Sequence, residues 1–129
     1  MNKAIVLMVA TLLSTGAVRP PAPTTELRTW TGWFSDRQCA HEPKADEAVR
    51  PNGTSCVKEC LLKGVAPVFL SEQTNAIYKV LDHPGVRDDV GYRVEVAVDV
   101  DEKAKTVSIR SVKRLSEVTA MCLLPKKRG

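Results

Sequence analysis

Four residues of the chain could bind a metal ion or form a disulfide: Cys39, His41, Cys56 and Cys60. Cys56 and Cys60 are four residues apart, so on a helix their side chains lie on one face, one turn apart. Three cysteines and one histidine are a ligand set that suits tetrahedral zinc or copper(I). The same residues allow a disulfide from Cys39 to Cys56 or Cys60, or buried thiols that only pack.

The beginning of the chain predicts export. Lys3 is followed by an apolar run over residues 4–13 and by small residues at 15–17, which is the pattern of a signal peptide. We therefore exclude residues 1–17 from the fold. The run is shorter than the roughly 20 residues that span a bilayer, so we expect no membrane span in the mature chain. The expected location is periplasmic or extracellular.

Export favours disulfides over metal sites, because exported thiols meet an oxidising environment. A bond between Cys56 and Cys60 is disfavoured, since both Cβ atoms tilt toward the same helix end. A bond from Cys39 to either of them closes a loop of roughly 20 residues and contributes about 3 kcal/mol. The remaining helix cysteine then pairs with Cys122, stays reduced or binds a metal. A structural disulfide is the main prediction, and metal binding is the alternative.

The elements that would position these residues follow from periodicity. Residues 54–64 are predicted as a short helix, with Thr54 or Ser55 as its cap and Gly64 at its end. Residues 36–53 are polar and rich in breakers, so they read as a long loop, which is usually functional or tied down. Asp36 is expected to cap the turn that opens this loop.

Strand periodicity first appears over residues 26–35. Trp30 and Phe34 are predicted to point inward, and Gly32 to permit a bend. Trp33 then points outward or lies beneath the following loop; if exposed, it would be a ligand-binding surface.

Four more strands follow in the sequence. The runs at 67–71 and 76–81 read as a hairpin, residues 91–100 as a strand with valines on one face, and residues 106–115 as a strand with a bulge near Arg110 or Ser111. Residues 86–90 could form one helical turn. The predicted fold class is mainly β: a small, five-stranded OB-like barrel with a short helix in the first connection. It would cover residues 26–116, between a Pro-rich leader at 18–25 and an extension at 117–129 with a basic tail.

The residues Thr-Gly-Trp-Phe-Ser-Asp at 31–36, followed by Cys39, the Cys56-x-x-x-Cys60 pair and Gly64, make a recurring pattern. This pattern resembles the DUF5818 family of small exported bacterial domains of unknown function. The resemblance implies an OB-like barrel in the cell envelope or outside the cell. It brings no known activity.

Charge and the remaining polar residues narrow the function. The formal net charge is +4, and the last residues, 126–128, carry three of these positive charges, so we expect no nucleic-acid partner. His83 precedes a proline, and the adjacent Asp88 and Asp89 point apart, so all three are expected to be solvated. No catalytic set emerges and no cofactor is expected. The predicted function is a non-enzymatic binding or structural module for a small ligand or envelope protein; the alternative is a metal-binding or redox protein using zinc or copper.

Overall fold

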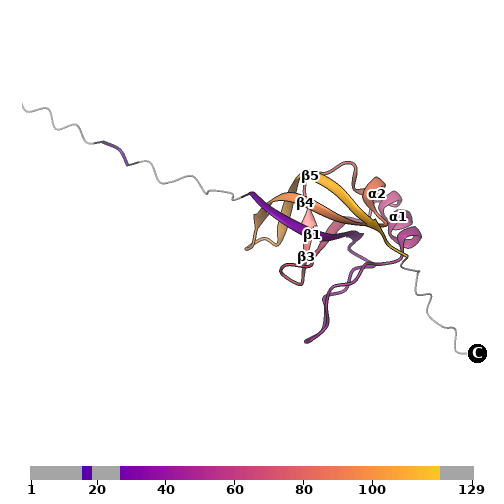
Figure 1. The fold of residues 1–129 in the computed structure, drawn as a ribbon. Helices are drawn as coiled ribbons and strands as arrows, with labels where there is room; N and C mark the ends of the chain where they lie inside the picture. The colour runs from indigo at the N-terminus through magenta and orange to yellow at the C-terminus, as the bar shows by residue number, and fades with distance from the viewer. Residues whose placement is uncertain (1–15, 19–26, 120–129) are drawn as a thin grey trace, which may run out of the picture.

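The structure is a computed structural model that describes residues 16–18 and 27–119. Within these residues, five strands form one mixed sheet that closes on itself in the order β1-β2-β3-β5-β4 (Figure 1). The mainly β class, the five strands and the helix in the first connection are thereby confirmed. The elements in chain order are β1 (Leu27–Asp36), α1 (Thr54–Leu62), β2 (Pro67–Ser71), β3 (Ala76–Val80), α2 (Val86–Asp89), β4 (Tyr92–Asp101) and β5 (Thr106–Glu117).

Strand β1 joins the two halves of the ring. Its first half, Leu27–Gly32, pairs with β4, and its second half, Gly32–Asp36, pairs with β2, both antiparallel. Gly32 lies where the partner changes. A Cβ atom there would lie 1.9 Å from the carbonyl oxygen of Leu70, so only glycine fits this close approach.

The interior of the ring is apolar, as the alternation along the strands predicts. Trp30 and Phe34 point inward and are 4% and 3% exposed. Trp30 packs against Tyr78 with ring centroids 4.9 Å apart, and Phe34 packs edge-on against Phe69 at 5.4 Å. The other buried members of this core are Val57, Val80, Val86, Val90, Val94, Val96, Val98, Val107 and Ile109.

A second apolar cluster lies on the outside of β2, beneath the long loop. Val68 and Leu70 alternate with the inward Phe69, and Val49 of the loop covers them. Four of the five residues of β2 are therefore buried, although an exposed strand would alternate. Trp33 is half-buried against this cluster.

The strand and helix ends test finer predictions. Ala97 pairs with Ser111 and Val98 pairs with Ile109, so Arg110 is the extra residue of the predicted bulge. Gly64 follows α1 with φ +87°, as expected.

The predicted cap of α1 by Thr54 or Ser55 is wrong. The N-cap of α1 is Gly53, the residue before Thr54. Glycine has no side chain to accept a hydrogen bond, so the first turn has no side-chain cap. Strand β5 ends at Glu117, one residue beyond the predicted domain boundary. Most of the predicted signal peptide and leader, the basic tail and Cys122 lie outside the described residues. The described part of the chain contains no helix with the length and apolarity needed to span a membrane.

Candidate metal and thiol centre

Three side chains meet where β1 ends: those of Asp36, Cys39 and Cys60. One carboxylate oxygen and the two sulfur atoms all lie within 4.8 Å of one another. Asp36 is the last residue of β1, Cys39 lies in the turn that follows, and Cys60 lies in the last turn of α1. The fold thus brings a strand end and a helix together at one point near the protein surface.

The carboxylate of Asp36 is only half satisfied. Its Oδ1 atom accepts hydrogen bonds from the backbone N–H groups of Gln38, at 2.8 Å, and Cys39, at 3.0 Å, which confirms the expected turn cap. Its Oδ2 atom is buried and has no hydrogen-bond partner among the described residues. The residue as a whole is 0% exposed. A buried acceptor without a donor costs about 1–3 kcal/mol, so Oδ2 is a position that a bound cation would stabilise.

The thiol of Cys39 has an environment that disfavours its anion. Burial, the neighbouring Asp36 carboxylate and Cys60 raise the pKa of Cys39 from 9.0 to about 12. Cys39 is therefore a protonated, weakly nucleophilic thiol at neutral pH in the absence of a cation. The thiol of Cys60 contacts the side-chain oxygen of Gln38, with 3.7 Å between sulfur and oxygen.

Polar and apolar contacts hold the two cysteines in place. Asn52 accepts a hydrogen bond from the hydroxyl of Ser35 at 2.6 Å and donates one to the carbonyl of Cys39 at 2.8 Å. This ties the end of the loop to its beginning. On α1, the fully buried Val57 anchors the helix in the core. Cys60 follows three residues later on the same face.

The structure brings together only two of the four predicted metal ligands. Cys39 and Cys60 come together, whereas His41 is exposed and neither His41 nor Cys56 belongs to the group. Asp36 joins instead. The sequence interpretation gave Asp36 only a capping role. Its place three residues before Cys39 in a tight turn is the signal that could have placed it beside that thiol.

The predicted disulfide from Cys39 is not formed in this structure. Cys39 and Cys60 are both free thiols, so Cys39 is bonded to neither helix cysteine. Pairing with Cys122 concerns a residue outside the described range. The juxtaposition of Cys39 and Cys60 nevertheless makes this one pair the candidate for a bond, and the disulfide stays a prediction.

The loop over residues 37–53 is fixed at its base and along one side. Asn75, in the turn between β2 and β3, accepts a hydrogen bond from the backbone N–H of Val49 at 2.7 Å and donates one to the carbonyl of Glu47 at 2.8 Å. Most of the loop between Cys39 and Val49 is exposed, including His41. Trp33 lies partly covered at this side of the sheet, so it is not an open platform.

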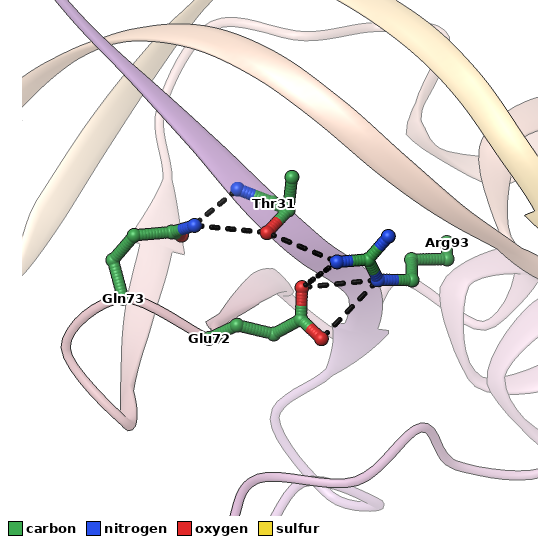
Figure 2. A network of polar contacts seen from close by, with 4 residues as sticks. All are labelled: Thr31, Glu72, Gln73 and Arg93. Atoms are coloured by element: carbon green, nitrogen blue, oxygen red, sulfur yellow. Dashed lines mark hydrogen bonds and ion pairs between the residues drawn. The ribbon is translucent and has the colours of Figure 1, made fainter.

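A second polar cluster surrounds Thr31 of β1, five residues before Asp36 (Figure 2). The guanidinium of Arg93 on β4 donates from Nε and Nη2 to the carboxylate of Glu72, with the shortest distance 2.7 Å. Gln73 brackets Thr31, accepting from its backbone N–H at 2.8 Å and donating to its hydroxyl at 2.9 Å. Partial burial would raise the pKa of Glu72, but hydrogen bonds from Arg93 and Thr31 and the charge of Arg93 lower it.

His83 and Asp89 are less solvated than the sequence indicated. The imidazole of His83 stacks on Phe34 with ring centroids 5.5 Å apart, and its Nε2 lies 3.1 Å from Asp89 Oδ2. Asp89 also accepts a hydrogen bond from Arg114 at 3.0 Å. The expectation of solvated side chains is wrong for these two residues, because His83 packs on Phe34 of β1 and Asp89 pairs with His83 and Arg114. His83 lines a surface groove of about 380 Å³, with Leu61, Val65, Pro67, Pro84, Val86, Arg87 and Asp88.

No protein-family model, curated protein sequence or solved structure matches this chain. The resemblance to the DUF5818 family stays a prediction.

Proposed function

We propose that this chain is an exported, non-enzymatic binding module with an OB-like barrel as scaffold and the loop over residues 37–53 as its binding element. The strand order and the position of the one-turn α2 before β4 support the OB-like assignment. Loops held on a rigid scaffold are where binding residues concentrate. The ligand class is a small molecule or an envelope protein.

The observation that carries this proposal is the way the loop is held. Asn52 and Asn75 fix its end and one side, while its middle, including His41, faces solvent. Such a loop presents side chains without a large loss of conformational entropy on binding. The groove is lined by Pro67, which pairs with Asp36 at the start of the loop, and its volume is typical of small-molecule sites, which supports a small ligand.

We also propose that a disulfide between Cys39 and Cys60 ties the loop to α1, and we call this bond the clamp. In an oxidising compartment the two thiols give up two protons and two electrons to a disulfide oxidant, which leaves as two thiols. The bond closes a loop of about 20 residues and stabilises the fold by about 3 kcal/mol through the unfolded state. The alternative metal set from the sequence loses support, because His41 and Cys56 lie outside the cluster.

The test of the clamp is intact-mass measurement of the exported protein with and without reductant, followed by alkylation and peptide mapping. We expect a linked Cys39–Cys60 peptide pair, and a loss of about 3 kcal/mol of unfolding free energy on reduction. The matched control is Cys60→Ser, whose stability should not respond to reductant through this pair. Complete alkylation of both Cys39 and Cys60 before reduction would refute the clamp.

A further inference from the structure

We propose that the reduced protein binds one Zn²⁺ ion between Asp36 Oδ2, Cys39 Sγ and Cys60 Sγ. This site goes beyond the proposed function, because it uses the reduced form of the sulfur pair whose oxidised form makes the clamp. It also differs from the ligand set expected from the sequence, since it excludes His41 and Cys56 and includes a carboxylate.

The strongest support combines two observations: Oδ2 of Asp36 is buried without a hydrogen-bond partner, and a carboxylate oxygen of the same residue lies close to two thiols. Zn–S distances of about 2.3 Å and Zn–O distances of about 2.0 Å place the ligand atoms of a tetrahedral site about 3.5–3.8 Å apart. One carboxylate oxygen of Asp36 and the two sulfur atoms already lie within 4.8 Å of one another. Binding therefore needs each pair to close by at most about 1.3 Å, and the ion satisfies the oxygen that the fold leaves unpaired.

The contacts around the ligands hold them in position before an ion arrives. The other oxygen of Asp36, Oδ1, accepts hydrogen bonds from two backbone N–H groups, and the carbonyl of Cys39 accepts one from Asn52. Hydrogen bonds of this kind orient the residues that bind a metal and tighten its binding. Cys60 projects from a helix that is anchored by the buried Val57.

The ligand chemistry favours zinc over copper(I). Copper(I) selects soft thiolate and thioether ligands, whereas zinc accepts carboxylate oxygen together with thiolate. Two thiolates and one carboxylate balance a divalent ion better than a monovalent one. Each thiol releases its proton to solvent when the metal binds. A water molecule or the side-chain oxygen of Gln38, which accepts a hydrogen bond from the thiol of Cys60, would supply the fourth ligand.

The experiment uses the full mature chain after reduction with a phosphine. One titration adds Zn²⁺ in competition with a chromophoric chelator, and a second adds Co²⁺ as a spectroscopic probe. We expect one ion per chain, and for Co²⁺ the visible bands of tetrahedral coordination with a thiolate charge-transfer band. The oxidised protein should not bind, because the disulfide removes both sulfur ligands.

Variants assign the ligands. Asp36→Asn keeps an amide oxygen for the two backbone N–H groups but loses the charged ligand, so zinc affinity should fall at least about tenfold. In Cys39→Ser and in Cys60→Ser, the zinc affinity should fall at least as far. Each of these variants should also lose the charge-transfer intensity that one sulfur contributes. His41→Ala is the matched control and should bind as the parent does. Circular dichroism of each metal-free variant checks that it remains folded.

Two outcomes overturn the site: reduced protein that binds zinc no more tightly than Asp36→Asn, or a His41→Ala variant that loses binding. These failures are separate from failure of the clamp. A protein that forms the Cys39–Cys60 disulfide but binds no zinc when reduced refutes the metal site alone. A protein that binds zinc when reduced but never forms the disulfide refutes the clamp alone.

Discussion

Two carboxylates beside β1 have opposite environments. Glu72 is partly exposed, and both of its oxygens accept hydrogen bonds from Arg93. Asp36 is fully buried, yet only one of its oxygens has a hydrogen-bond partner among the described residues. Full pairing at the surface marks Glu72 as a structural group that links β2–β3 to β4. Incomplete pairing in the interior, next to two thiols, marks Asp36 as a group that the fold keeps available for a cation.

The largest expected effect concerns the thiol beside Asp36. In the reduced, metal-free protein at pH 8, iodoacetamide should modify Cys39 about a thousandfold more slowly than in the urea-unfolded chain, because its pKa lies near 12 instead of 9.0. Time-resolved peptide mass spectrometry measures this rate. The Asp36→Asn variant should recover part of the reactivity. Equal rates in the folded and unfolded chains would mean that burial and the Asp36 carboxylate do not raise the pKa of Cys39. The contrast between Asp36 and Glu72 would then lose its main support.

A middle-sized effect separates the two oxygens of Asp36. Asp36→Ala removes the acceptor for two backbone N–H groups and should lower the unfolding free energy of the reduced protein by about 1–2 kcal/mol. Asp36→Asn keeps that acceptor and replaces the unpaired charged oxygen with a neutral NH2 group, so its unfolding free energy should fall less than that of Asp36→Ala. Urea unfolding measures both. If Asp36→Asn is as unstable as Asp36→Ala, the unpaired oxygen does not strain the fold.

The smallest effect belongs to Glu72. Glu72→Gln should lower the unfolding free energy by about 0.5–1 kcal/mol, since the ion pair is bidentate but partly screened by solvent. Because folding lowers the pKa of Glu72, its contribution is present above the ordinary value of 4.5 and disappears as pH falls below that value.

The difference in stability between parent and Glu72→Gln should therefore vanish in acid. Asp46→Asn, an exposed carboxylate-to-amide change in the loop, is the control and should leave stability unchanged. A gain in stability from Glu72→Gln, or a pH-independent loss, would contradict the contrast with Asp36.

Local patterns were sufficient to predict the strands. The inward Trp30 and Phe34 and the bulge at Arg110 follow from alternation with period two, which a half-buried strand imposes on its own sequence. The number of strands could also be predicted, because each apolar run is short and is bounded by turn residues. The closed sheet contains these five strands.

The candidate centre was only half predictable, because it depends on contacts between distant segments. Cys39 and Cys60 were visible as candidates by residue type. The orphaned oxygen of Asp36 was not visible, since it arises only when α1 closes over the end of β1. In the same way, stacking on Phe34 withdraws His83 from solvent, and nothing next to His83 in the sequence indicates this.

The pairing of β1 with two partners has a consequence for the order of folding. The half of β1 that pairs with β2 finds its partner about 35 residues later, whereas the half that pairs with β4 waits for Val94–Asp99. The ring then closes through only two parallel residue pairs, Lys79↔Thr106 and Val80↔Val107. Such distant pairings slow folding, because loop closure must precede the contacts that reward it. The Asp36–Cys39–Cys60 centre joins residues that are close in the sequence, but α1 is anchored by Val57 in the core that all five strands build. The centre should therefore reach its final geometry only when the ring has closed.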